Sequence, residues 1–120
     1  FDVVIQINLK AAMFLAQAAA VAALGDADFL QELLLELVEQ GKQQAKDMKA
    51  YIEKLDWYNL NLQAHSLKGA SAQLACKPLS QSAFILERAA KVQEEENLTS
   101  SLQVLEKRLD ELAVYLNNNL

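Results

Sequence analysis

Hydrophobic residues recur at steps of three and four along most of this 120-residue chain, and no stretch alternates polar and apolar residues with period two. Steps of three and four place apolar side chains on one face of an α-helix, whereas a half-buried strand requires alternation. We therefore expect helices over approximately residues 8–24, 27–55, 59–75, 78–93 and 99–117, and no β-sheet.

The connections between these helices contain residues that favour helix ends. Gly25 and Asp26 supply a C-terminal glycine followed by an N-capping aspartate, and Pro78 suits the first turn of the fourth helix. We expect Thr99 or Ser100 to cap the last helix. The side chains predicted to face the core are Leu30, Leu33, Leu37, Ala45, Met48, Ile52 and Leu55 in the second helix; Leu60, Ala64, Leu67, Ser71 and Leu74 in the third; Leu79, Ala83, Leu86 and Ala90 in the fourth; and Leu98, Leu102, Leu105, Leu109, Leu112 and Leu116 in the last.

Gly41 interrupts the second helix and lies on its apolar stripe. Glycine in a helix interior costs about 1 kcal/mol relative to alanine. We expect this glycine to mark either a close contact or a gentle bend.

The short connections make consecutive helices neighbours, and no linker rich in Pro, Gly or Ser divides residues 1–120. The predicted fold class is therefore all-α: a single domain formed by an antiparallel up-down four-helix bundle, with an additional N-terminal helix covering one end or side. The segment Ala11–Leu24 has some features of a signal peptide, since Lys10 precedes it and small residues lie near its end. It is too short to span a bilayer, and Asp2 does not suit a signal peptide, so a buried Ala-rich helix is the preferred interpretation.

Composition and charge limit the function classes. The chain is 52% apolar and 22% charged with three glycines and one proline, which is typical of a helical globular domain. Its net charge of −5, without a Lys/Arg cluster, argues against nucleic-acid binding. Cys76 is the only cysteine, so it cannot form an internal disulfide, and we expect a small buried residue. His65 is the only histidine, which disfavours a His-containing dinuclear metal site; we expect no bound metal or cofactor.

The direction of His65 follows from the geometry of the third helix. With about 100° per residue, and with the apolar stripe centred at zero, His65 falls at about 140°, Lys68 at about 80° and Gly69 at about 180°. His65 is therefore expected to face away from the core. A structural core histidine is disfavoured, while an ordinary surface histidine remains the alternative.

The residues that follow His65 supply space and charge. Gly69 and Ala72 lie at i+4 and i+7 and Lys68 at i+3, so all three are neighbours of the imidazole on the helix surface. A mid-helix glycine is unfavourable, and clearance for an approaching partner is one reason to have it. A neutral imidazole is a nucleophile near neutral pH, and an ammonium can offset the charge of an attached phosphoryl group. This combination suits a phosphoryl acceptor.

The segment Ala64–Leu74, AHSLKGASAQL, resembles the signature H-x-L-K-G-[SA]-[SA] of histidine phosphotransfer (HPt) domains. Leu79 and the pair Leu86-Glu87 fit the pattern downstream of that signature. Residues 25–38 are similar to the segment that opens the long helix of the family. Together these matches cover most of the chain, and the last helix matches only in pattern.

The resemblance implies a role for four residues. His65 would be phosphorylated through Nε2, Lys68 would steady the phosphoryl group, and Gly69 would leave room for the partner. Glu87, on the next helix, would accept a hydrogen bond from the imidazole Nδ1–H; a solvated helix charge is the alternative for this residue. The family often has glycine where this chain has Ala75, a departure that concerns the helix end more than the chemistry.

The resemblance also implies a function. The chain would be a phosphorelay phosphocarrier without autonomous catalytic activity, accepting a phosphoryl group from a receiver-domain aspartate and passing it to another response-regulator receiver. The expected partners are receiver domains, which would carry their own Mg²⁺, and a hybrid sensor histidine kinase, with no nucleic acid and no membrane. We expect a cytoplasmic monomer, with access to the nucleus if the source is eukaryotic.

Two other hypotheses use the same helices. A non-catalytic helical-bundle adaptor would bind receiver or kinase domains without phosphotransfer, but it would not need both His65 and Lys68. The phosphoacceptor module of a chemotaxis-type kinase would need a catalytic ATP-binding region elsewhere in a longer chain.

Overall fold

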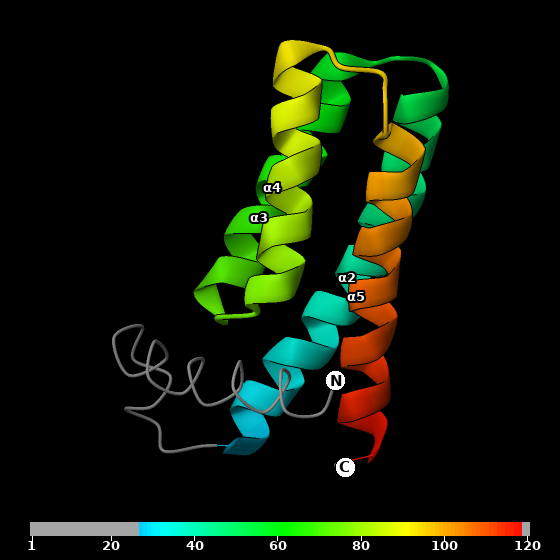
Figure 1. Ribbon diagram of the computed structural model, residues 1–120. Helices are drawn as coiled ribbons and strands as arrows, with labels where there is room; N and C mark the ends of the chain where they lie inside the picture. The colour runs from blue at the N-terminus through cyan, green and yellow to red at the C-terminus, as the bar shows by residue number, and fades with distance from the viewer. Residues whose placement is uncertain (1–26, 119–120) are drawn as a thin grey trace.

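The computed structural model describes residues 27–118, which form four α-helices (Figure 1). Helix α2 spans Ala27–Glu53, α3 spans Trp57–Gln73, α4 spans Lys77–Val92 and α5 spans Leu98–Asn118. The four-helix, all-α part of the prediction is confirmed. The helix predicted over residues 8–24 lies outside the described residues, as does the cap predicted at Gly25 and Asp26. No helix within residues 27–118 combines the length and apolar character needed to cross a membrane.

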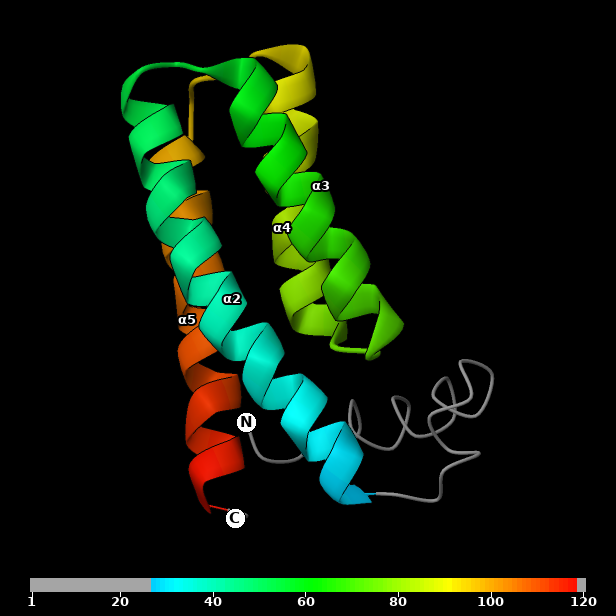
Figure 2. The same cartoon turned by 180° about the vertical axis from the view of Figure 1, so that it is seen from behind.

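The four helices alternate in direction and close into a ring. Each helix packs against its neighbour in the chain, and α5 also packs against α2. Figures 1 and 2 show α2 beside α5 in one half of the bundle and α3 beside α4 in the other. At 27 and 21 residues, α2 and α5 are the longest helices, and both extend past the turn between α3 and α4 (Figure 2).

The predicted apolar stripes meet in the core. All the stripe residues predicted for α4 and α5 are buried, as are the first four of α3. Ser71 is accommodated there because its hydroxyl donates a hydrogen bond to the carbonyl of Leu67 at 2.6 Å, so no polar atom is left unpaired. The stripe of α2 is partly wrong, since Leu34 takes the fully buried place expected for Leu33.

The prediction that Leu55 faces the core is also wrong. Its side chain is 43% exposed, because α2 ends at Glu53 and Leu55 adopts a left-handed backbone with φ of 52°. The chain leaves the helix here because Asp56 caps α3. Its carboxylate accepts a hydrogen bond from the backbone N–H of Asn59 at 3.2 Å and one from the Asn59 side chain at 2.7 Å.

The cap predicted for the last helix is wrong, whereas the departure at Ala75 concerns the end of α3, as expected. Helix α5 begins at Leu98, so Thr99 and Ser100 lie inside its first turn and do not cap it; the Ser100 hydroxyl donates to the Asn97 carbonyl instead. Ala75, which follows α3, has a φ of 54°. A left-handed backbone costs a non-glycine residue roughly 1–2 kcal/mol, so the departure from the family's glycine affects this turn.

Gly41 marks a close contact between helices. A β-carbon at this position would lie 2.6 Å from Cδ2 of Leu109 on α5 and 3.5 Å from Cδ1 of Leu67 on α3. Because both leucines are almost completely buried, the missing side chain lets α2 approach its two neighbours.

Candidate functional site

His65 lies on the outer face of α3, and its side chain is 65% exposed. The residues that turn inward on either side of it, Ala64 and Leu67, are completely buried. The core contacts of α3 therefore fix the rotation of the helix, and this rotation directs the imidazole to solvent. The direction predicted from the helical spacing is confirmed.

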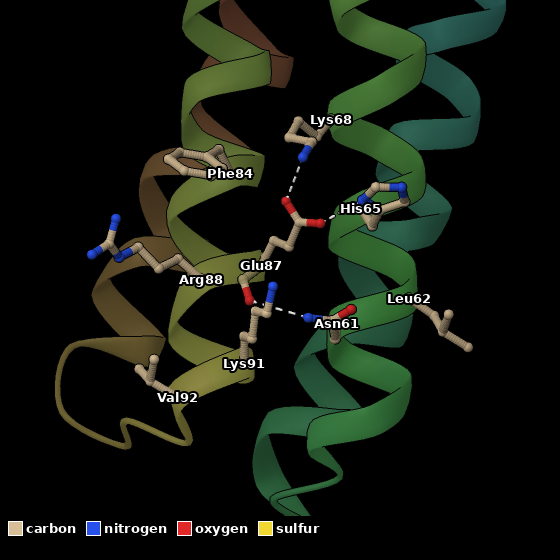
Figure 3. A pocket seen from close by; sticks show the side chains of 9 residues that line it. All are labelled: Asn61, Leu62, His65, Lys68, Phe84, Glu87, Arg88, Lys91 and Val92. Atoms are coloured by element: carbon tan, nitrogen blue, oxygen red, sulfur yellow. Dashed lines mark hydrogen bonds and ion pairs between the residues drawn. The ribbon is translucent and has the colours of Figure 1, made fainter.

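Glu87 of α4 contacts the imidazole. Its Oε2 atom is bound to Nδ1 of His65, and its side chain is only 14% exposed (Figure 3). The neighbouring Leu86 is completely buried, so Glu87 sits at the edge of the core stripe, facing α3. The alternative of a solvated helix charge is therefore wrong.

Lys68 contacts the second oxygen of the same carboxylate. Its Nζ atom lies 2.6 Å from Glu87 Oε1 and 5.4 Å from the ring centre of Phe84, and the lysine side chain is 29% exposed. Oε1 is shielded from solvent and accepts no well-directed hydrogen bond within the described residues, so the ammonium charge is its main compensation. One carboxylate thus bridges an imidazole and an ammonium (Figure 3).

Two opposing effects act on the pKa of Glu87. Partial burial raises it, but the polar contacts of its two oxygens with Lys68 and His65, and the positive charge of the Lys68 ammonium, lower it by more. The net result is a pKa below that of an ordinary glutamate. Glu87 is therefore an anion at neutral pH, and its Oε2 accepts a hydrogen bond that Nδ1–H of His65 donates.

The two flanks of α3 are held to the neighbouring helices by polar contacts that the sequence analysis did not single out. The side-chain amide of Asn61 donates to the backbone carbonyl of Glu87 at 3.3 Å, which ties α3 to α4 one turn from His65. On the other flank, the buried Gln44 of α2 donates to Gln63 and Ser66, at 3.2 and 3.3 Å. Asn61 precedes His65 by four residues and could have been recognised as its helical neighbour, but its partner on α4 depends on the tertiary fold.

The space around the ring is open. Gly69 is exposed, and a β-carbon added to it would meet no atom within 4 Å apart from its chain neighbours and the backbone of its own helix. Packing within residues 27–118 therefore gives no reason for glycine at this position. Lys91, one turn beyond Glu87, is exposed on the same side.

The chemistry available at this site follows from the two ring nitrogens. Because the Glu87 carboxylate can only accept a hydrogen bond from Nδ1–H, the lone pair of the neutral ring lies on Nε2. Nε2 is then a nucleophile on an exposed side chain, with an ammonium one helical turn away. Within residues 27–118 no three His, Cys, Asp or Glu side chains are grouped to hold a metal ion.

Cys76 lies outside this site. It is buried after α3, and burial raises the pKa of its thiol to about 12. A thiol with this pKa is protonated at neutral pH and therefore a poor nucleophile.

Searches of curated protein sequences and of solved structures gave no significant match. A family model described as the Hpt domain matches residues 12–115, which covers α2, α3, α4, most of α5 and every site residue described above. The chain therefore belongs to the Hpt domain family, whose members carry phosphoryl groups in phosphorelays and are not autonomous enzymes.

Proposed function

We propose that this chain accepts a phosphoryl group on Nε2 of His65 from the phosphorylated aspartate of one receiver domain and passes it to the aspartate of another, in the cytoplasm. The observation that supports this most directly is the division of the imidazole between two environments. Nδ1 is bound to a largely buried carboxylate, while the side chain that bears Nε2 is 65% exposed.

Bonds, electrons and protons are all accounted for in the transfer step. The Nε2 lone pair attacks the phosphorus of the aspartyl phosphate, an N–P bond forms, and the bonding electrons of the breaking P–O bond leave with the aspartate carboxylate. The ring keeps its proton on Nδ1 and gains a positive charge, which the anionic Glu87 stabilises at hydrogen-bonding distance. Onward transfer reverses these steps, and the ring leaves as a neutral imidazole. Mg²⁺ on the receiver would supply the other part of the charge stabilisation.

Lys68 has to change partners during this cycle. Before phosphorylation its Nζ atom pairs with Glu87 at 2.6 Å. A phosphoryl dianion on His65, one helical turn away, is the stronger attractor for the ammonium, and the flexible lysine stem allows the move. We infer that Lys68 stabilises the phosphorylated state after leaving Glu87, and that the open space at Gly69 admits the partner's phosphorylated loop.

The test is a transfer experiment with a panel of receiver domains, each charged with acetyl phosphate and Mg²⁺. Intact mass of the wild-type chain is expected to rise by one phosphoryl group, and the adduct should be acid-labile and alkali-stable, as a phosphohistidine is. Because His65 is the only histidine in the chain, an adduct with this chemistry identifies the residue, and His65→Gln should abolish it. A folded chain that binds receivers but is never labelled would refute the proposal and favour the adaptor hypothesis.

A further inference from the structure

An open groove runs between α3 and α4 and borders His65 (Figure 3). Three of its apolar residues are strongly exposed: Leu62 at 47%, Phe84 at 46% and Val92 at 62%. Phe84 and Val92 lie two helical turns apart on α4, with Arg88 between them, and Figure 3 shows these three side chains along one edge of the groove. We call this surface, including Lys68 and Lys91 between the helices, the α3–α4 face.

The charge of the α3–α4 face differs from that of the chain. The whole chain carries a net charge of −5, yet this face contains three cations, Lys68, Arg88 and Lys91. Its one carboxylate, Glu87, is occupied by His65 and Lys68. Neither Arg88 nor Lys91 forms an ion pair with a carboxylate of the described part of the chain. Two uncompensated positive charges thus lie among exposed apolar side chains.

We propose that the α3–α4 face is the docking surface for a receiver domain, which places its acidic rim on Arg88 and Lys91 and an apolar side chain against Phe84 and Val92. This inference rests on the proposed function. A phosphoaspartyl site that binds Mg²⁺ needs several carboxylates, so the surface that delivers the phosphoryl group is anionic. The α3–α4 face offers the complementary charge within reach of His65, with apolar contacts that exclude water around the ion pairs.

The charge pattern also orients the partner. The acidic residues Glu94, Glu95 and Glu96 begin two positions after Val92, so the positive region ends at the α4–α5 connection. A receiver whose carboxylates covered this connection would be repelled. Its acidic rim therefore has to lie toward the middle of α4, which is the level of Glu87 and His65 (Figure 3).

The test compares initial rates of phosphoryl transfer from the receiver domain that labels His65 fastest, at increasing concentrations of the full chain. Arg88→Glu and Lys91→Glu are each expected to raise the half-saturating concentration about tenfold at low salt, and to reduce the salt dependence of transfer. Lys107→Glu, an equal change of charge at an exposed position on α5, should stay within about twofold of wild type. Val92→Ser should weaken transfer, whereas Val114→Ser, at a position 52% exposed on α5, should not.

Direct labelling of His65 by the small donor phosphoramidate needs no docking, so it shows separately whether the histidine of each variant is reactive. If Arg88→Glu and Lys91→Glu behave like Lys107→Glu while His65 is labelled normally, the docking inference is wrong and the proposed function stands. Sedimentation of the wild-type chain gives the competing outcome: a dimer that dissociates on Val92→Ser would assign the α3–α4 face to a second copy. If no receiver labels the wild-type chain, the proposed function fails, and a receiver is not the partner of this face.

Discussion

Substitution of Gly69 by alanine should change the stability of the chain and its reaction with a partner in opposite directions. Gly69 lies within the helix Trp57–Gln73, and apart from its chain neighbours and the backbone of its own helix, no atom lies within 4 Å of where the alanine β-carbon would be. The substitution therefore removes the conformational entropy cost of glycine without adding a clash, and should raise the free energy of unfolding by about 0.5–1 kcal/mol. For a domain of this size, we expect a rise of roughly 2–6 °C in the melting temperature.

The same substitution at Gly41 is the matched control, because there the new β-carbon would lie 2.6 Å from the buried side chain of Leu109. Leu109 can shift only within a packed core, and overpacking costs typically about 1–3 kcal/mol. This cost exceeds the gain in helix propensity, so Gly41→Ala should lower the unfolding free energy or at best leave it unchanged. Urea denaturation followed by far-UV circular dichroism measures both variants.

Transfer from a receiver domain should respond in the opposite sense to stability. If Gly69 leaves room for the partner, Gly69→Ala should reduce transfer to His65 about three- to tenfold, and Gly69→Leu should reduce it further. Phosphoramidate, which needs no docking, should label His65 equally in all variants. Normal receiver transfer in folded Gly69→Leu would refute the clearance argument, and a destabilised Gly69→Ala would refute the account of the helix.

Four further predictions concern Glu87, Asn61 and Cys76. Glu87→Gln removes the charge that stabilises the phosphorylated ring, so receiver transfer should fall about tenfold or more, and an unchanged rate would show that the charge is not needed. Because the pKa of Glu87 is lowered in the folded chain, its contribution to stability is present above the ordinary pKa of glutamate and is lost as the pH falls through the folded value. Urea denaturation from about pH 6 to about pH 3 should therefore show a steeper loss for wild type than for Glu87→Gln, and parallel curves would contradict this. Asn61→Ala should cost about 0.5–1.5 kcal/mol and shift the ¹⁵N resonances of the His65 ring; unshifted resonances would show that the contact with α4 does not position the site. Cys76, with a pKa raised to about 12 by burial, should react with a disulfide reagent only as the chain unfolds, and rapid labelling of the native chain would contradict its burial.

The regular spacing of leucines made most of the fold predictable. Leu98 through Leu116 recur at three- and four-residue steps, and every member of that stripe is buried in α5. The end of α2 was less predictable, because Leu55 continues the apolar spacing although the chain has already left the helix. That end depends on a local competition in which the Asp56 carboxylate caps α3, and hydrophobic spacing does not report such a cap.

At the site, the sequence alone identified the functional residues of α3, but it did not show which side chain of α4 contacts them. The direction of His65 follows from helical geometry alone, since Ala64 and Leu67 define the buried face. The partner of its Nδ1 atom does not follow from helical geometry, because Glu87 is 22 residues away and reaches the ring through the packing of α4 against α3. The resemblance to HPt domains suggested Glu87, whereas nothing in the sequence indicated that Lys68 would share its carboxylate.

That sharing explains why a glutamate suits this position better than a glutamine. With a neutral ring, the charges of Glu87 and Lys68 cancel, so the resting site carries no net charge. After phosphorylation the phosphoryl dianion is opposed by Lys68 and by a ring that keeps its Nδ1 proton, and the carboxylate favours that proton. The proton matters because it allows the ring to leave as a neutral imidazole during onward transfer, whereas a ring without it would have to leave as an imidazolate, a far poorer leaving group. Because the carboxylate stabilises the phosphorylated ring more than the resting ring, Glu87→Gln should slow the loading of His65 more than it slows transfer from phosphorylated His65, and separate single-turnover rates for the two directions measure this difference. Equal slowing would mean that Glu87 only orients the ring.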